Sequence, residues 1–562
     1  MRPGRLTSPR RSSPDIGLKE LTLASSRSPS RLQGMWPERP VADFLVGLFL
    51  QEINRIYEIT HPLSFKQRYA TWWAAQEQME SFVDATLTDE DIDFGILIVR
   101  LCLLGMQCLP HSRYPPADIL KVDLDHLEEW LLFTANEVEK SQPAGKKPSI
   151  ITVQHRFYHV CYLKNYAKIR DSWSILNMAI REAHEVGLHL KDPGFPLSEL
   201  DLEIRRRTFW NLYVWDRFMC TCFGHWPLIP EGYFDIDPPH DNLDPLTLAP
   251  YALTPFTDRV FHIKLARFQT AFMSPPSWRE DQTDPITVAE FAQRFQEVII
   301  DQLPPPYWLD NPDTTWDAVE PSIVHKRANL HFAIHSTKAA LFRAFVDPCH
   351  SIRCDRNPGS SHSANLLALS HRRTLMDSGC KVLASITRLY KLTADEEGGT
   401  AERLFMLPVN LVEELVCLGV CLLSIQADER KLAKKSTLIS PDLNLQYSYA
   451  TFFDGYDMLC HQAPQYGIAR RGVSILDNVQ GNLRHSFSRR DLLDANSALA
   501  INPTAGPCSF HLEHALASLH GTGEEVLSSD PPLPLPEWLP SFVKSHSRSW
   551  LFHDGAAFGD LL

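Results

Sequence analysis

The residues best suited to bind a metal lie in two short segments near the middle of the chain. His184 and His189 stand five residues apart in the string HEVGLH, and Cys220, Cys222 and His225 fall within six residues. Imidazole and thiolate are common zinc ligands, but a spacing of five places two side chains about 140° apart around a helix. Neither segment has a second Cys or His pair at a supporting distance in the sequence. We therefore expect no metal site, and we interpret the two cysteines as buried free thiols near a helix end.

Recognisable catalytic motifs are missing as well. The sequence has no GxxxxGK[ST] phosphate loop, no GxGxxG turn, no GxSxG nucleophile elbow and no HExxH zinc motif. No set of nucleophile, base and oxyanion donor can be identified. An enzyme is therefore the least favoured class of function.

The most informative segment is Glu199–Phe223, which combines charges and aromatic rings at helical spacing. Its charged and aromatic motif consists of Glu203, Arg205, Arg206, Arg207, Trp210, Tyr213, Asp216 and Arg217. Apolar residues line two sides of the same helix, one stripe running from Ile204 to Met219 and the other from Trp210 to Phe218. Such a helix is buried between neighbours, so its charges must be paired or must reach solvent at its ends. We expect a structural polar network, with a ligand or effector site as the alternative.

The elements that position this motif are predicted to be helices. Apolar residues recur every three or four positions over most of the chain, and alternating β-patterns are few. The predicted helical segments are 41–61, ended by Pro62, and 91–109, 149–168, 171–188, 199–223, 255–273, 288–303, 322–345, 366–392 and 404–428. We expect an all-α fold, a large multi-helix array of roughly ten or more helices joined by Pro-rich loops. No self-similar period indicates tetratricopeptide repeats.

The N-terminal segment has a different composition from the helical body. Residues 1–40 are rich in Arg, Ser and Pro without a hydrophobic period, which predicts a disordered basic arm. Residues 1–34 carry a net charge of +5 in a chain of −13, so the remainder carries −18. A basic arm on an acidic body is common in nuclear proteins, because Arg and Lys displace counterions from phosphates. A solvated tail without a partner is the alternative.

The C-terminal segment, 486–562, is predicted to be a mostly disordered tail. Its last residues contain apolar side chains separated by acids, which makes a possible activation segment of Trp550, Leu551, Phe552, Phe558, Leu561 and Leu562. This composition is typical of segments that fold on a coactivator groove. A C-terminal helix that docks onto the core is the alternative.

Nothing in the sequence predicts secretion or insertion into a membrane. The first twenty residues hold no apolar run of about 7–15 residues. Two apolar runs, Phe94–Leu109 and Leu411–Ile425, contain charges and are shorter than the ~20 residues that cross a bilayer. Twelve scattered cysteines are typical of free thiols in a reducing compartment. We expect a cytosolic or nuclear protein.

The motif of the 199–223 helix resembles the fungal-specific transcription factor domain, the middle homology region of fungal zinc-cluster regulators. That family carries an acid and two or three arginines, then Trp, Tyr and Asp-Arg at helical spacing, a Gly-Arg-Pro turn and an acidic Pro-bearing segment. The eight motif residues match in order, and Asp235, Asp237, Pro238 and Pro239 match the acidic segment. Segments 173–189, 49–65 and 340–345 resemble other parts of the family, so the similarity spans about Val41 to Arg388.

Two features depart from the family pattern. Gly224, His225, Trp226 and Pro227 replace the Gly-Arg-Pro turn. The family usually has an N-terminal cluster of six cysteines that binds two zinc ions and places a helix in the DNA major groove, but the first cysteine here is Cys102. No zinc ligand or base-contacting residue can therefore be transferred, and no cofactor is visible in this chain.

The resemblance implies a nuclear, non-enzymatic regulator of RNA polymerase II transcription, acting on a metabolic or secondary-metabolite gene set. Its helical regulatory domain is expected at 41–485. DNA contact would come from a zinc-cluster exon missing from this chain, from a DNA-binding partner, or from weak binding by the basic arm. Other expected partners are a coactivator on the C-terminal tail, a small-molecule effector, and a second subunit in a homo- or heterodimer, with no membrane contact. The alternative is a helical ligand-binding or interaction scaffold without direct DNA binding.

Overall fold

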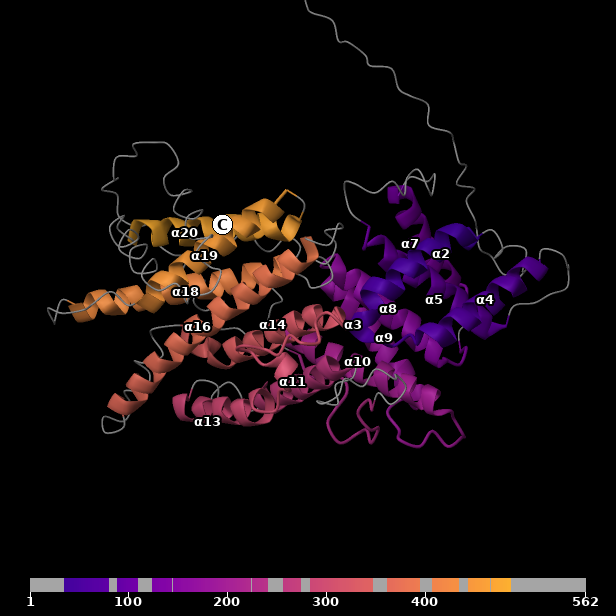
Figure 1. The fold of residues 1–562 in the computed structure, drawn as a ribbon, viewed down its shortest axis with the longest axis horizontal. Coiled ribbons are helices and arrows are strands. Elements are labelled where there is room, and N and C mark those ends of the chain that lie inside the picture. The colour runs from indigo at the N-terminus through magenta and orange to yellow at the C-terminus, as the bar shows by residue number, and fades with distance from the viewer. Residues whose placement is uncertain are drawn as a thin grey trace, which may run out of the picture.

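Every regular element that the structure describes is helical, as the sequence predicts. The computed structural model describes residues 35–79, 88–109, 124–143, 145–223, 225–240, 256–273, 284–346, 361–394, 407–433, 443–464 and 466–486. The helices, labelled as in Figure 1, are α2 (Arg39–Leu48), α3 (Asn54–Tyr57), α4 (Pro62–Met79), α5 (Asp89–Met106), α7 (Leu124–Lys140), α8 (Ile150–Asn165), α9 (Ile169–Glu185), α10 (Glu199–Phe223), α11 (Thr257–Met273), α13 (Pro285–Phe295), α14 (Ser322–Phe342), α16 (Ser361–Ala394), α18 (Leu407–Ala433), α19 (Leu443–Gln462) and α20 (Gly467–Ser486). Short π-helical turns follow α2 (Phe49–Ile53) and α13 (Gln296–Ile300), and 3₁₀ turns occupy Pro305–Tyr307 and Arg343–Val346.

Local sequence signals explain several of the helix starts. Thr88 caps α5 in a reciprocal capping box with Asp91, and Ser149 caps α8 in the same way with Thr152. Asp284 accepts a hydrogen bond from the Thr287 amide at the start of α13. These side chains satisfy amide groups that the first helical turn leaves without a partner.

The prediction that Pro62 ends the first helix is wrong in its position. The helix ends at Tyr57, because Glu58 adopts a left-handed conformation with φ of 50°. Pro62 is instead the first residue of α4. Proline suits that position, since its missing N–H would have no intrahelical partner there.

The helices form a continuous array in which consecutive elements pack on one another. In Figure 1, α2–α9 gather on one side of the molecule and α16–α20 on the other, with α10, α11 and α14 between them. Helix α10 contacts α8, α9 and α11; α11 contacts α14, and α14 contacts α16. The helix that carries the charged motif therefore lies between the two groups.

Small residues allow close contact within each group. A Cβ atom on Gly105 of α5 would lie 2.1 Å from the carbonyl oxygen of Leu45 on α2. A Cβ atom on Gly472 of α20 would lie 2.3 Å from a methyl carbon of Val412 on α18. Only glycine permits these helix crossings without a shift of the backbone or of a neighbouring side chain.

Helix α18 is long and apolar enough by length and composition to cross a membrane, over Leu407–Ser424. In the structure 94% of that segment is buried, against α16, α19 and α20. Burial of this kind is that of a core helix in a helical array. The buried acids Glu413 and Glu414 on α18 face Arg343, at 2.6 and 3.7 Å.

Other sequence predictions about the array have mixed outcomes. The predicted 199–223 helix coincides with α10, while α4, α7, α19 and α20 were not predicted. The eight cysteines that the structure describes are free thiols, and seven of them are buried. Most of the predicted basic arm, all of the tail beyond residue 486, and with it the predicted activation segment, lie outside the described residues.

Candidate functional site

The charged motif of α10 makes three separate attachments. The first is formed by Arg205, whose guanidinium donates to the carbonyl oxygens of Val186 (3.1 Å) and Gly187 (2.8 Å). These carbonyls follow the last residue of α9 and have no partner further along that helix. Arg205 therefore fixes the end of α9 against the first turns of α10.

The second attachment is an ion-pair network on the N-terminal half of α10. Glu203 is buried and pairs with Arg206 (3.3 Å) and Arg207 (3.0 Å) one turn further along. It also accepts a hydrogen bond from the His240 amide (3.2 Å). Arg207 continues the network, since it lies 3.4 Å from both the carboxylate and the carbonyl oxygen of Glu58.

Glu58 connects this network to the other half of the chain. Its second carboxylate oxygen lies 2.6 Å from the ammonium of Lys326, on α14. Burial opposes the charge on Lys326, but Glu58 and Asp258 outweigh it and raise the pKa of Lys326. Glu58 thus contacts two cations, one from α10 and one from α14, in an interior where an isolated charge would be costly.

Asp258 and Arg259 extend the network onto α11. Arg259 donates to the Asn211 side chain, which itself donates to the Tyr57 carbonyl oxygen (2.9 Å). Asp258 is buried, and one of its carboxylate oxygens has no hydrogen-bond partner among the described residues. Burial raises the pKa of Asp258, against the lowering effect of Lys326 and Arg259. We refer to Glu58, Glu203, Arg207, Asp258, Arg259 and Lys326 as the Glu58 network.

The aromatic residues of the motif hold the segment that follows α10. The indole N–H of Trp210 donates to the Asp237 carbonyl oxygen (2.9 Å), and its ring packs edge-on against Phe234 with centroids 5.4 Å apart. The hydroxyl of Tyr213 donates to Glu231. Both rings are buried, so they anchor residues 231–237 to one face of α10.

The third attachment is a clamp formed by Asp216 and Arg217. Asp216 accepts hydrogen bonds from the amides of Leu228 and Ile229, both at 3.0 Å, and pairs with Arg217 at 2.6 Å. Arg217 also donates to the Ile229 carbonyl oxygen (2.7 Å) and to Thr270 of α11 (2.6 Å). Burial raises the pKa of Asp216, and the two amides oppose this shift. The pair therefore fixes residues 228–229 between α10 and α11.

The turn that departs from the family pattern has its own contacts. The His225 ring stacks on Trp173 of α9, with centroids 5.0 Å apart. Trp226 is 63% exposed, and its carbonyl oxygen accepts a hydrogen bond from the Cys220 thiol (3.2 Å). The segment after it returns to the α9–α10 connection, because the Lys191 amide donates to Asp235 (2.8 Å).

The metal-like strings do not assemble a metal site among the described residues. Helix α9 ends at Glu185, so His189 lies beyond it and the helical spacing argument does not apply to this pair. The rings of His184 and His189 instead stack with centroids 4.6 Å apart. Cys220 is a buried thiol on α10 as expected, and the side chain of Cys222 lies outside the described residues.

The motif residues are thus distributed over several sides of α10 and do not converge on one pocket. Their charged and polar groups bind backbone atoms and side chains of opposite charge, and these contacts hold the neighbouring elements together. The arrangement offers no nucleophile with an adjacent base. Sequence reasoning missed Glu58, Asp258, Arg259 and Lys326. No periodic or motif signal marks these residues, since Glu58 lies 149 residues from Arg207 and 268 residues from Lys326 in the sequence.

Comparison with known proteins finds a family model that covers this motif. Residues 46–297 match the model of the fungal specific transcription factor domain. The chain is similar to the probable transcription factor sol4 of Alternaria solani, with 29% identity over 63% of this chain and 62% of that protein. It is also similar to the transcription factor xilB of Penicillium rubens, with 24% identity over 68% of this chain and 56% of that protein.

A more distant relative is the thiamine repressible genes regulatory protein thi1 of Schizosaccharomyces pombe, 23% identical over 34% of this chain and 23% of that protein. The chain spans about three fifths of the length of the first two relatives. No solved structure matches it.

Proposed function

Since residues 46–297 form a fungal-specific transcription factor domain, we propose that this chain is a gene-specific regulator of transcription by RNA polymerase II. The match of this domain is the observation that carries the proposal. Several relatives are named as transcription factors, which supports it. The helical fold alone would not support a role in transcription, because helical arrays serve many functions. The proposal assigns the chain no catalytic role.

The regulatory part of the proposal concerns the Glu58 network. Glu58 follows α3, Arg207 belongs to α10 and Lys326 to α14, so one carboxylate joins the N-terminal helices to the middle of the array. Buried ion pairs of this kind contribute little net stability but strongly disfavour arrangements in which one partner loses the other. We assign the network the role of fixing how the N-terminal helices pack on α10, α11 and α14, and a ligand or partner that regulates the protein would have to change this packing.

Contact with DNA and with the transcription machinery belongs to the proposal as well. A DNA-binding partner, or a zinc-cluster segment encoded with this chain, would supply sequence-specific contacts, while the basic arm would add contacts to phosphate. The C-terminal segment Trp550–Leu562 would recruit a coactivator, and the protein would act in the nucleus. The relative named for thiamine-repressible genes supports a metabolic gene set as the target.

Chromatin occupancy of the full chain, tagged at its own locus, tests the proposal directly. We expect discrete promoter peaks, and transcripts mapped from the same cells will show whether a cysteine-cluster exon is joined to this chain. Peaks without that exon would indicate recruitment by a partner. A protein that is present in the cytosol and gives no peaks would refute transcriptional regulation and would favour a helical sensor or scaffold.

A further inference from the structure

A cavity of about 520 Å³ lies outside the charged motif, between α14, α16 and the segment that joins α13 to α14. Its lining residues come from 296–310, from one face of α14 and from one face of α16. Nearly all of them follow the segment that matches the family model. The volume is within the range of pockets that hold small organic ligands.

Cationic side chains dominate the polar part of this cavity. Lys338 projects from α14, and Lys381 and Arg388 project from α16, while Asp310 is the one carboxylate among the lining residues, all of which the structure describes. Lys381 pairs at its outer side with Asp377 (3.0 Å). Lys338 and Arg388 form no hydrogen bond or ion pair with any residue in the described ranges. The site is therefore locally basic within a body whose net charge is strongly negative.

Lys381 lies close enough to Lys338 to oppose its charge. Burial and the nearby Lys381 lower the pKa of Lys338, and burial and Arg327 lower the pKa of Arg388. Burial also lowers the pKa of His331 to about 4 and that of His335 to about 3, so both rings are neutral at pH 7. An anion in the cavity would relieve the repulsion and complete the charge balance.

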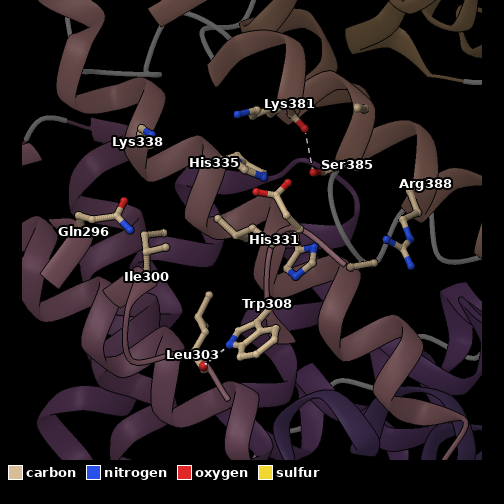
Figure 2. Close-up of a pocket in the computed structure, with 14 residues that line it drawn as sticks. Gln296, Ile300, Leu303, Trp308, His331, His335, Lys338, Lys381, Ser385 and Arg388 are labelled. Carbon is tan, nitrogen blue, oxygen red and sulfur yellow. Dashed lines mark hydrogen bonds between the residues drawn. The ribbon is translucent and has the colours of Figure 1, made fainter. Parts of the chain in front are cut away.

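The remaining walls supply apolar surface and a neutral imidazole. Figure 2 shows Lys338, Lys381 and His335 toward one side of the cavity, and Trp308 and Leu303 toward the opposite side. Trp308 is held by a hydrogen bond from its indole N–H to the Leu303 carbonyl oxygen (3.0 Å), and half of its side chain is exposed. The Nδ1 atom of His335 is buried without a hydrogen-bond partner among the described residues.

We propose that this cavity binds a small organic anion with an apolar, preferably aromatic, body and a carboxylate or phosphate head group. The head group would lie between Lys338 and Lys381, within reach of His335, and the body would pack on Ile300, Leu303 and Trp308. The inference rests on the proposed function, since the anion would be the effector of the regulator. Binding would draw α14 and α16 together through one ligand.

Isothermal titration of the purified full chain tests the site with three probes of similar shape. 1-Naphthoate carries a carboxylate, 1-naphthyl phosphate carries a phosphate, and 1-naphthalenemethanol has no charge. We expect saturable one-to-one binding of at least one anion, at least tenfold tighter than the neutral alcohol. The better of the two anions identifies the head group.

Matched variants locate the binding site. We expect Lys338→Gln and Lys381→Gln each to weaken binding of the anion about tenfold, the usual effect of losing one charge-assisted contact. Arg373→Gln is the control, because Arg373 is an exposed residue of α16 that does not line the cavity. Thermal melts of the free variants check that each is folded.

Three results would overturn the proposal: no saturable binding of either anion, equal binding of the neutral alcohol, or equal weakening by Arg373→Gln. These results would not affect the proposed function, which depends on chromatin occupancy measured in cells. Promoter peaks with a cavity that binds no anion would leave a regulator without this effector. An anion bound without promoter peaks would leave a ligand-binding protein without transcriptional output.

Discussion

Replacing Lys326 with methionine should destabilise the whole array through the loss of one buried charge. Methionine retains most of the volume of the lysine stem but removes the ammonium that lies 2.6 Å from Glu58. The Lys326 side chain is 7% exposed and the Glu58 side chain 12%, so water cannot replace the lost partner. Removing one member of a buried ion pair costs about 3–5 kcal/mol.

The remaining contacts of Glu58 reduce this penalty. Arg207 still approaches the Glu58 carboxylate, although at 3.4 Å rather than 2.6 Å. We therefore expect a loss of about 2–3 kcal/mol in the free energy of unfolding, at or just below the lower end of the range for buried pairs. For a helical body of this size the melting temperature should fall by roughly 2–4 °C.

Urea unfolding followed by circular dichroism at 222 nm measures the loss, in a double-mutant cycle with Glu58→Gln. The double variant should recover about 1–3 kcal/mol relative to the sum of the single variants, because the two side chains are in contact. The folded pKa of Lys326 is raised, so the contribution of the pair is present below the unfolded pKa of about 10.4 and is lost only as the pH rises above it. The contribution of Lys326 should thus not change between neutral pH and pH 9. Burial raises the pKa of Glu58, so the cost of the substitution should become smaller as the pH falls and the Glu58 carboxyl takes up a proton.

The surface pair of Lys140 and Glu137 provides the control. Their contact is 2.8 Å, but the Lys140 side chain is 72% exposed. Lys140→Met should change the free energy of unfolding by no more than about 0.5 kcal/mol. If Lys326→Met costs no more than Lys140→Met, or if the cycle shows no coupling, the Glu58 network does not hold the helices together and the reasoning is wrong.

Three further predictions follow from the packing, the protonation and the motif. Gly105→Ala should lower the melting temperature, because a Cβ atom there would overlap the Leu45 carbonyl oxygen, whereas Gly47→Ala, which meets no atom within 4 Å, should be neutral or slightly stabilising; equal effects would contradict the close approach. Burial lowers the pKa of His159 to about 2, so the neutral ring contributes stability that is present above the unfolded pKa of about 6.5 and is lost as the pH falls. The free energy of unfolding should therefore fall by about 2 kcal/mol between pH 7 and 5 on account of this residue. In His159→Gln, the free energy of unfolding measured by urea titration should depend less steeply on pH across this range. Asp216→Ala should release residues 228–229 and alter target-gene output at unchanged protein level in a reporter strain, whereas a fall in protein abundance alone would mean that the clamp is only structural.

The sequence predicts elements well where one helix carries a strong pattern of its own. Helix α10 has the predicted bounds because apolar stripes on two sides leave no other conformation that buries them. Helix α4 carries no such pattern, because its apolar residues do not gather on one face, whereas α7 and α20 have a clear helical period from which both helices can be predicted. The end of the first helix was misplaced because nothing in the sequence marks Glu58 as left-handed.

The candidate site shows the limit of the same reasoning. The sequence predicts that the charges of α10 must be paired, because a helix buried on two sides cannot leave them without partners. It cannot predict the partners, since Glu58 and Lys326 become neighbours only when distant parts of the chain pack together. The cavity is equally hidden, because Lys338 and Lys381 belong to different helices and neither stands in a recognisable motif.

Helix α14 links the two sites physically. Near its start, Lys326 reaches Glu58, and one and three turns further along, His331 and Lys338 line the cavity. Between them Arg327 holds the preceding loop through Asp317 and the Pro306 carbonyl oxygen, so this end of the helix is fixed on two sides. A ligand can shift the packing of the array only if it binds one arrangement of α14 more tightly than another. A bound anion that repositions α14 would therefore have to work against the Glu58 network, and the strength of that network sets the free energy that such an effector must supply.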